Sequence, residues 1–316
     1  MSSPSDTPEH QTAPAVLMIR PAHFAGNAET RGSNYFQQAG AAEDTDAARR
    51  ARSEFDAFAA RLAIAGVGVT VFPGSNDEPL PDEVFPNNWL SLHADGTAVL
   101  YPLMAANRRR ERRPALLDGL RARGYRIGRV VDLTPFEARR QYLEGTGSLV
   151  LDRGNRVAYA CVSPRTHPAP LAAFCRELGY EAVSFSAADR SGRPIYHTNV
   201  LMSVGRAFAA ICSHAIGDPT ERARVLARLR ATSREILDLT FGQLHAFAGN
   251  MLELRGSGHA VIALSASALE SLDADQRRLL AKHGELVTAD LACIERLGGG
   301  SARCMLAEIA FATDRN

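Results

Sequence analysis

The sequence has few cysteines, and they are not spaced to cross-link the chain or to bind a metal. Five cysteines stand in 316 residues, at positions 161, 175, 212, 293 and 304. Their number is odd, the chain is not small and no C-x-x-C pair is present, which argues against a disulfide framework and a zinc site. We therefore expect a reducing, cytoplasmic location and no metal. One cysteine can still be a nucleophile.

Strong net charge and long apolar runs are also missing. The 36 Lys and Arg residues almost balance the 35 Asp and Glu residues, so no global field favours nucleic acid or a membrane as partner. The longest apolar runs, around Val99 and Val261, are far shorter than a membrane span. The start of the chain is polar and lacks the layout of a signal peptide, so residues 1–14 are expected to be a disordered leader.

The sequence does contain a short segment that recurs five times. The copies are VFPNNWLSLH from Val84, LEGTGSLVLD from Leu143, YHTNVLMSVG from Tyr196, FAGNMLELRG from Phe247 and GGGSARCMLAEI from Gly298. Four of them share one polar residue followed by two apolar ones, and the second copy is the loosest match. Equivalent positions 88, 147, 199, 250 and 304 are 59, 52, 51 and 54 residues apart. Such regular spacing indicates one supersecondary unit used five times.

Each repeat runs from a polar turn through one or two apolar strands and an amphipathic helix to a short strand. Apolar periodicity predicts helices at about 45–65, 112–123, 168–178, 220–237 and 267–283, each followed by a β-rich stretch, the fourth being LTFGQLHAF. Five ββαβ units, each too small to bury its own apolar face, are expected to pack around a common axis. This predicts an α/β fold, a five-bladed α/β propeller in a single domain over residues 15–316. The alternative is an ordinary α/β sheet with coincidentally similar turns.

The propeller would bring the polar residues that open the strands together in one axial pocket. These residues are Asn88, Glu144, His197, Asn199, Asn250 and Cys304. Cys304 follows a glycine run that allows close approach of the backbone to a ligand, which favours a nucleophile, whereas the other four cysteines sit inside apolar patterns typical of inert thiols. His197 would supply the proton-transfer partner and Glu144 an orienting carboxylate. No His, Asp and Glu cluster has metal-ligand spacing.

Three motifs in order resemble the guanidine-modifying superfamily, which includes arginine deiminases, dimethylarginine dimethylaminohydrolases and amidinotransferases. They are Leu143–Gly147, His197-Thr198-Asn199 and the closing Gly-Gly-Gly-Ser-Ala-Arg-Cys304. The resemblance implies a five-bladed propeller and a Glu–His–Cys catalytic set that needs no cofactor. It implies that Cys304 forms a covalent thio-intermediate, that His197 protonates the leaving nitrogen and then activates water, and that Glu144 holds the end group of the substrate.

Two arginines match further parts of the same pattern. Arg165 in Ser163-Pro164-Arg165-Thr166 resembles an arginine that binds the substrate α-carboxylate, and Arg108 resembles a second carboxylate contact. A guanidinium fork suits a carboxylate by bidentate geometry. The Arg109–Arg113 cluster is interpreted as a solvated helix start, since no aromatic interleaving supports a nucleic-acid patch.

Two asparagines depart from the arginine deiminase pattern and bear on the substrate. Asn88, preceded by Asn87, and Asn199 stand where deiminases have the aspartates that clamp a cationic guanidinium. An asparagine amide both donates and accepts hydrogen bonds, which suits a neutral ureido group, and Glu144 then remains the only formal counter-charge for a cation. Asn87, Asn88, Asn199 and Asn250 are predicted to bind substrate. The pattern most resembles citrulline utilisation hydrolases, which convert citrulline to ornithine, CO₂ and ammonia.

Other functions stay open at this point. Within the same fold the chain could be an arginine dihydrolase, which releases two ammonia molecules, or an arginine deiminase that stops at citrulline. From a different class, a non-catalytic protein could sense an amino acid in the axial pocket, although a sensor has no need of a nucleophile. The predicted partner is a small amino-acid substrate, and the sequence leaves open whether the chain forms a homo-oligomer.

Overall fold

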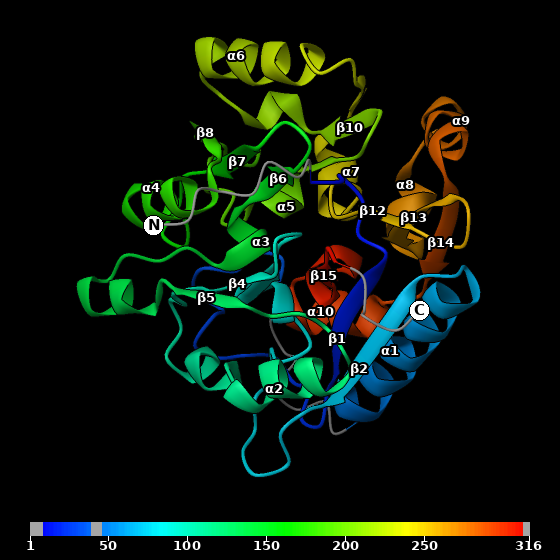
Figure 1. The fold of residues 1–316 in the computed structure, drawn as a ribbon. Coiled ribbons are helices and arrows are strands. Elements are labelled where there is room, and N and C mark those ends of the chain that lie inside the picture. Colours follow the sequence, from blue (N-terminus) through cyan, green and yellow to red (C-terminus); the bar gives the residue numbers. More distant parts are fainter. Residues whose placement is uncertain (1–8, 39–45, 312–316) are drawn as a thin grey trace.

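Five three-stranded sheets surround a central axis in the computed structural model, which describes residues 9–38 and 46–311 (Figure 1). In chain order the sheets are β3 (Leu90–Leu92), β4 (Thr97–Leu100) and β5 (Arg129–Asp132); β6 (Val150–Asp152), β7 (Val157–Cys161) and β8 (Glu181–Phe185); β9 (Met202–Val204), β10 (Phe208–Ile211) and β11 (Glu235–Asp238); β12 (Leu252–Arg255), β13 (Ala260–Ser265) and β14 (Glu285–Ala289); and β15 (Ala307–Ile309), β1 (Ala15–Arg20) and β2 (Gly68–Pro73). The predicted five-bladed α/β propeller is confirmed.

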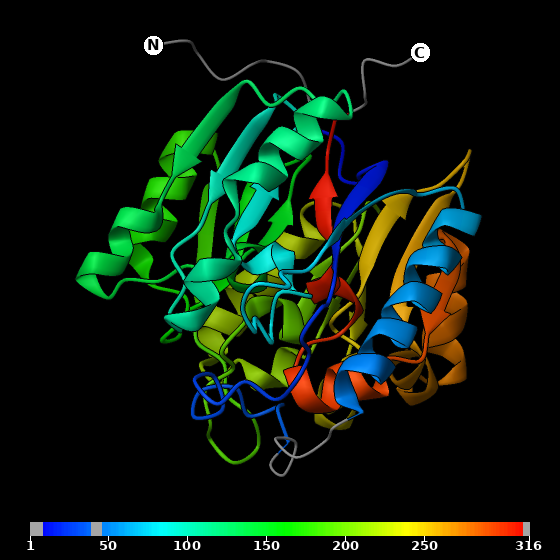
Figure 2. The ribbon, with the colours of Figure 1, turned by 90° about the horizontal axis from the view of Figure 1, so that it is seen from below.

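All five sheets share one topology. The middle strand pairs antiparallel with one neighbour and parallel with the other, as β4 does with β3 and β5. The short strands β15, β3, β6, β9 and β12 each open a repeat, and contacts from β15 to β3, from β6 to β9 and from β9 to β12 place them around the axis. The fifth sheet joins the two ends of the described chain, because β15 pairs antiparallel with β1 near the axis (Figure 2).

The longest helices lie on the outside of the sheets (Figure 1). They are α1 (Ala47–Ile64), α2 (Pro114–Ala122), α4 (Pro168–Leu178), α6 (Pro219–Arg230) and α9 (Ala274–His283). The shorter ones are α3 (Gly145–Ser148), α5 (Thr198–Leu201), α7 (Phe241–His245), α8 (Ala266–Ser271), α10 (Ala292–Gly298) and the 3₁₀ turns η2 (Pro86–Asn88), η3 (Asn107–Glu111), η4 (Thr134–Arg139), η5 (Ser213–Ala215) and η6 (Ala302–Met305). Among these, α3, α5 and α10 lie near the axis (Figure 1). The helix predicted over 168–178 has the bounds of α4.

The fourth repeat differs from the sequence prediction. The helix expected over 220–237 ends at Arg230, and residues 235–238 form strand β11 instead. The LTFGQLHAF stretch, predicted to be β-rich, contains helix α7. A capping box explains it, because the Thr240 hydroxyl accepts from the Gln243 amide and the Gln243 side chain accepts from the Thr240 amide, which satisfies two orphan donors at the helix start.

The helix predicted over 267–283 is two helices. Helix α8 ends at Ser271, and Asp273 then starts α9 with a second capping box that pairs it with Gln276. The carboxylate of Asp273 accepts from the Gln276 amide at 2.8 Å. A strong N-cap inside an apolar period breaks the helix, since the capping residue itself takes a non-helical conformation.

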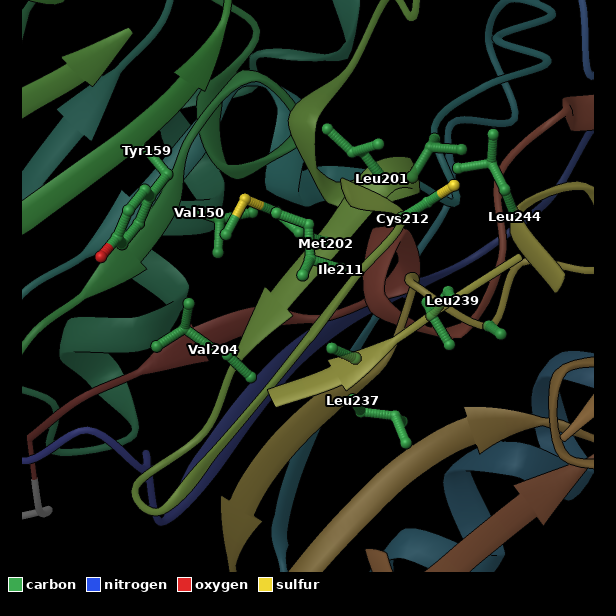
Figure 3. Close-up of a cluster of buried hydrophobic side chains, with 14 of the residues drawn as sticks. Val150, Tyr159, Leu201, Met202, Val204, Ile211, Cys212, Leu237, Leu239 and Leu244 are labelled. Carbon is green, nitrogen blue, oxygen red and sulfur yellow. The ribbon is translucent and has the colours of Figure 1, made fainter. Parts of the chain in front are cut away.

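Apolar side chains from neighbouring sheets pack together between the blades. The largest core cluster joins Val150 and Tyr159 of the β6–β8 sheet to Met202, Ile211 and Leu237 of the β9–β11 sheet (Figure 3). Fully burying one such side chain stabilises the fold by about 1.5–3 kcal/mol. No single repeat holds this cluster, so the blades depend on one another and hold the axial residues in a fixed arrangement.

The described part of the segment expected to be a disordered leader, residues 9–14, packs against the rest of the protein. Residues 1–8 lie outside the described residues. Glu9 is buried, where its carboxylate accepts from Arg153 Nη1 at 2.6 Å and from the Tyr180 hydroxyl at 2.7 Å. Gln11 Nε2 donates to the carbonyl oxygens of Leu151 and Val204. For residues 9–14 the expectation is wrong, because their polar side chains satisfy buried groups of two blades.

Within the described ranges, none of the helices has the length and apolarity needed to cross a lipid bilayer.

Candidate active site

The predicted site residues lie on short helical turns that immediately precede the strands around the axis. Asn88 ends η2, Asn199 lies in α5 and Cys304 lies in η6. Glu144 is the residue before α3, and His197 is the residue before α5. Equivalent turns of the propeller therefore point side chains from four repeats at one end of the axis.

These turns surround a small pocket with a cavity volume of about 10 Å³, roughly the room that one water molecule needs. Its lining includes five predicted residues, Asn88, Arg108, Arg165, His197 and Cys304. The other lining residues are Asn34, Asp82, Phe85, Tyr196, Gly298, Gly299 and Gly300. Segments far apart in the sequence thus form one polar chamber that contains a thiol, an imidazole and two guanidinium groups.

Glu144 lies directly behind His197 and is completely buried. Its Oε2 is 2.8 Å from His197 Nε2 and 3.4 Å from Arg165 Nη1, and its Oε1 accepts from the Met104 amide at 3.0 Å. Burial opposes ionisation, but Arg165 and the hydrogen bond from His197 outweigh it and hold the pKa of Glu144 well below its ordinary value. A carboxylate only accepts hydrogen bonds, so His197 Nε2 carries the proton and Nδ1 is left as the basic nitrogen.

His197 is neutral at physiological pH in this environment. Burial lowers its pKa to about 4, although the hydrogen bond and the charge of Glu144 oppose the shift. A Cβ atom at Gly147 would lie 2.9 Å from His197 Nδ1 and 2.5 Å from Asn88 Nδ2. The absence of a side chain at Gly147 therefore allows the imidazole and the Asn88 amide to approach this turn.

The Cys304 thiol is buried beside two amides. Asn199 Nδ2 lies 3.5 Å and Asn250 Nδ2 lies 3.3 Å from Cys304 Sγ. Burial raises the pKa of the Cys304 thiol, while the hydrogen bonds from Ser301 and Asn250 oppose that rise. The sulfur is one wall of the pocket and the only thiol that lines it.

The two arginines sit in different networks. Arg108 forms a bidentate ion pair with Glu111 at 2.9 Å and donates to Asn88 Oδ1 at 2.8 Å. Arg165 Nη2 donates to the Ser33 hydroxyl at 2.7 Å, and its guanidinium lies over the Tyr196 ring. Arg108 thus has a buried carboxylate partner for both arms of its fork, whereas Arg165 donates to a hydroxyl and lies 3.4 Å from Glu144 Oε2.

Sequence reasoning missed Asp82, a carboxylate that lines the pocket. Its Oδ2 accepts from Asn27 Nδ2 at 2.7 Å, while its buried Oδ1 has no hydrogen-bond partner among the residues that the structure describes. Burial raises the pKa of Asp82, and Arg108 opposes that rise. Glu144 is therefore not the only formal counter-charge at the pocket, as the sequence had suggested. The signal was an acidic residue six positions before Asn88, which had the appearance of an ordinary loop residue.

Three predicted substrate-binding residues, Asn87, Asn199 and Asn250, do not line the pocket. Asn87 lies behind Asn88 and accepts a hydrogen bond from its amide at 3.0 Å. Asn250 contacts the sulfur and the Asn199 carbonyl, and Asn199 lies on the far side of the sulfur as well. These residues contact the side chains of Asn88 and Cys304, which do line the pocket.

Among residues 9–38 and 46–311, no set of three or more His, Cys, Asp and Glu side chains is arranged to hold a metal ion.

A protein-family model described as "N,N dimethylarginine dimethylhydrolase, eukaryotic" matches residues 20–311. A search of curated proteins by sequence gives no match. Similar solved structures include the substrate-bound N-terminal domain of ArgZ, an arginine dihydrolase from the ornithine–ammonia cycle in cyanobacteria, with 17% identity, a TM-score of 0.73 and coverage of 93% of this chain and 97% of that chain.

Two further structures have the same fold. Unliganded AgrE shares 17% identity at a TM-score of 0.73, over 95% of this chain and 40% of AgrE. A dimethylarginine dimethylaminohydrolase adduct with S-methyl-L-thiocitrulline shares 14% identity at a TM-score of 0.62, over 93% of this chain and 99% of that chain. At these low sequence identities, the structural similarity shows a shared fold only. Family membership rests on the match to the family model.

Proposed function

The chain belongs to the family of eukaryotic-type N,N dimethylarginine dimethylhydrolases, in the amidinotransferase superfamily, and from this premise we propose a cysteine-dependent hydrolysis of citrulline. Membership makes the protein a hydrolase of C–N bonds in guanidino-like groups. The observation that carries the proposal is the convergence of Cys304, His197 and the buried Glu144 at one pocket, with the short contact between His197 and Glu144.

Cys304 is the nucleophile in this proposal. Its sulfur attacks the ureido carbon of citrulline, ammonia leaves, and a thiocarbamate joins Cys304 to the δ-nitrogen side of the substrate. His197 Nδ1 takes the proton of the Cys304 thiol, gives it to the nitrogen that leaves as ammonia, and then takes a proton from the water that attacks the intermediate. That proton returns to the sulfur when the carbamate is released. The carbamate released by water breaks down to ornithine and CO₂, so one water is consumed for each ammonia. Glu144 keeps the imidazole in one tautomer throughout.

The amino-acid end of the substrate has two complementary groups. Arg165, stacked on Tyr196, can turn its fork toward an α-carboxylate, and the unpaired Oδ1 of Asp82 can accept from an α-ammonium. Both side chains are buried, so charge-assisted hydrogen bonds formed there are not screened by water. This pairing supports a free amino acid as substrate.

The charge balance around Glu144 favours a neutral end group. Its Oε2 lies 3.4 Å from Arg165 Nη1 and 3.9 Å from Arg108 Nη1, in addition to the contact with His197. A guanidinium placed against this carboxylate would also face two other guanidinium groups. Asn88 supplies a neutral amide nearby in place of a second carboxylate. A ureido group avoids the desolvation cost that a cation would carry.

Arginine dihydrolysis is the second candidate. The carboxylates in and around the pocket outnumber the guanidinium groups: they are Asp82, Glu111 and Glu144, against Arg108 and Arg165. Burial raises the pKa of Glu111 to about 7. When all three carboxylates are ionised, the chamber holds one more negative than positive charge, which suits a cationic substrate. The likeness to ArgZ adds to this candidate.

An ammonia-release screen separates these functions. Purified protein is incubated with citrulline, arginine, methylated arginines and agmatine, and ammonia, ornithine and citrulline are quantified. Citrulline hydrolysis gives one ammonia for each ornithine, arginine dihydrolysis gives two, and a deiminase gives citrulline without ornithine. Release of methylamine or dimethylamine with citrulline would place the protein with dimethylarginine hydrolases instead. No product from any of the four would contradict the proposal.

A reducing, cytoplasmic location and a single catalytic domain over residues 15–316 remain part of the proposal. All five cysteines are free thiols, which is compatible with a reducing compartment.

A further inference from the structure

Two asparagine side chains hold the Cys304 sulfur from one side. Asn250 Nδ2 lies 3.3 Å and Asn199 Nδ2 lies 3.5 Å from Sγ, and the carboxamide oxygens lie 3.7 and 3.8 Å from it. Both asparagines occupy the same position in consecutive repeats, 51 residues apart. The propeller symmetry therefore brings two equivalent amides to one sulfur.

Neither asparagine faces the substrate pocket. Asn199 lines a separate small cavity near the axis together with Ser203, Arg303 and Glu308, and Asn250 lines neither chamber. Cys304 belongs to the substrate pocket and Asn199 to the cavity behind it. Of these three residues, only Cys304 lines the substrate pocket.

The orientation of Asn250 is fixed at both ends of its amide. Nδ2 also donates to the Asn199 carbonyl at 2.9 Å, and Oδ1 accepts from the Arg303 amide at 3.0 Å. The oxygen is held by a backbone donor next to Cys304, and the NH₂ nitrogen lies closer to the sulfur than the oxygen does, at 3.3 Å against 3.7 Å. Asn199 contacts the sulfur with its side chain and holds Asn250 with its backbone, so removing its side chain leaves the second amide in place.

The charged and titratable groups around the sulfur do not replace these amides. His197 is neutral above a pKa of about 4, and burial raises the pKa of Tyr196 so that its hydroxyl stays protonated while it donates to the Gly299 carbonyl. Arg303 is paired with Glu308 at 2.8 Å. Glu144 and Asp82 are carboxylates and disfavour a second anion. A buried thiolate in this setting needs neutral donors aimed at it.

We propose that Asn199 and Asn250 form a two-amide cradle that orients Cys304 Sγ toward the pocket and stabilises its thiolate, and that they are positioning residues without contact to substrate. The proposal rests on Cys304 as the nucleophile of the proposed function. Amide N–H groups directed at the sulfur bond the thiolate more strongly than the thiol, so the cradle shifts the balance toward the reactive form.

The test measures the thiol directly and needs no turnover. The pH dependence of Cys304 alkylation by iodoacetamide, followed by mass spectrometry of the peptide that carries Cys304, reports its ionisation between pH 6 and 10. We expect Asn199→Ala and Asn250→Ala each to raise the apparent pKa of the thiol by about one unit, so alkylation at a fixed pH below that value is about tenfold slower. Asn250→Asp, similar in shape but without the donor, should raise it at least as much.

A matched control keeps the comparison specific. Ser203→Ala changes a residue that lines the same axial cavity as Asn199, and it should leave the alkylation profile within twofold of wild type. Glu111, whose pKa is about 7, is present in every variant, so its contribution cancels from the comparison. Asn199→Ala keeps the Asn250 network, so it provides a folded variant if changes at Asn250 prevent folding.

Substrate binding separates the cradle from direct contact. On a Cys304→Ser background, Asn199→Ala should change the calorimetric Kd for citrulline by less than twofold. An unchanged alkylation profile in Asn199→Ala and Asn250→Ala, or a tenfold weaker Kd with an unchanged profile, would overturn the cradle. If the protein hydrolyses none of the substrates tested, the proposed function fails, but the alkylation profiles still decide the cradle.

Discussion

Arg108 Nη1 donates to Asn88 Oδ1 over 2.8 Å, and this hydrogen bond fixes the direction of the Asn88 amide. Asn88 Nδ2 is directed at Asn87 Oδ1, 3.0 Å away. Both ends of the amide therefore have partners within the protein, and the position borders a cation. The side chain at this position therefore accepts a hydrogen bond from Arg108 as well as lining the pocket.

Replacing Asn88 with aspartate should shift the preference toward arginine only moderately. The new carboxylate would pair with Arg108, which offsets most of its charge, so we expect the affinity ratio of arginine to citrulline to rise about three- to tenfold, roughly 0.7–1.4 kcal/mol. Calorimetry with both substrates on a Cys304→Ala background measures the ratio. A ratio that stays constant or moves toward citrulline would contradict the charge argument.

Cys304 should be the one thiol that turnover requires. Cys304→Ser is expected to lower kcat by several orders of magnitude with an unchanged circular dichroism spectrum, because the side chain is nearly isosteric and its neighbours are amides. Cys175→Ser provides the control, since Cys175 lies on the outer helix α4 away from the pocket. Near-normal activity of Cys304→Ala would refute the mechanism.

Replacing Arg165 with alanine should mainly affect catalysis, whereas replacing Arg108 with alanine should affect stability. Arg165→Ala removes the proposed carboxylate contact and should reduce kcat/KM by about 10- to 150-fold, the equivalent of roughly 1.5–3 kcal/mol. Arg108→Ala leaves the buried Glu111 and Asp82 without their cation and should lower the free energy of unfolding by about 3–5 kcal/mol. Steady-state kinetics and urea denaturation of both variants make the comparison. Equal use of agmatine and arginine-type substrates would argue against the Arg165 assignment.

A side chain at Gly147 should disable the site. The Cβ of Gly147→Ala would lie 2.5 Å from Asn88 Nδ2 and 2.9 Å from the His197 ring, so one of them must move. We expect kcat to fall at least about tenfold, since one displaced catalytic group is costly. Gly242→Ala is the matched control, because the added Cβ would lie no closer than 3.8 Å to its nearest neighbour, the Thr240 hydroxyl. The prediction fails if both variants retain wild-type kcat.

Stability should depend on pH through His197. Its pKa is about 4 in the folded protein and about 6.5 in the unfolded chain, so between these values the unfolded state binds more protons and stability increases with pH. Glu111, with a raised pKa of about 7, acts in the opposite direction over an overlapping range. Comparing His197→Gln with wild type isolates the histidine, and thermal melts should show that the variant gains less stability than wild type when the pH rises from 4.5 to 7. An equal or larger gain in the variant would show that His197 is not buried in its neutral form.

The sequence by itself determined the architecture. Five copies of a polar turn followed by an apolar strand, spaced 51 to 59 residues apart, predict the propeller because no single unit can bury its own apolar face. The same copies predicted that Asn88, His197 and Cys304 would share one pocket, and local spacing was sufficient because a symmetric repeat maps equivalent positions to equivalent places.

Only the tertiary structure decided which polar groups meet. Nothing in the local sequence indicates that Asp82 is buried beside Arg108. The sequence also predicts Asn250 as a substrate ligand, whereas the fold places its amide nitrogen 3.3 Å from the Cys304 sulfur. Glu9 was assigned to a leader until Arg153, 144 positions away, paired with it. These roles arise from burial and from partners distant in the chain. The periodicity of a sequence describes one face of one helix or strand. It therefore cannot predict which charged side chain of another blade will pack against that face.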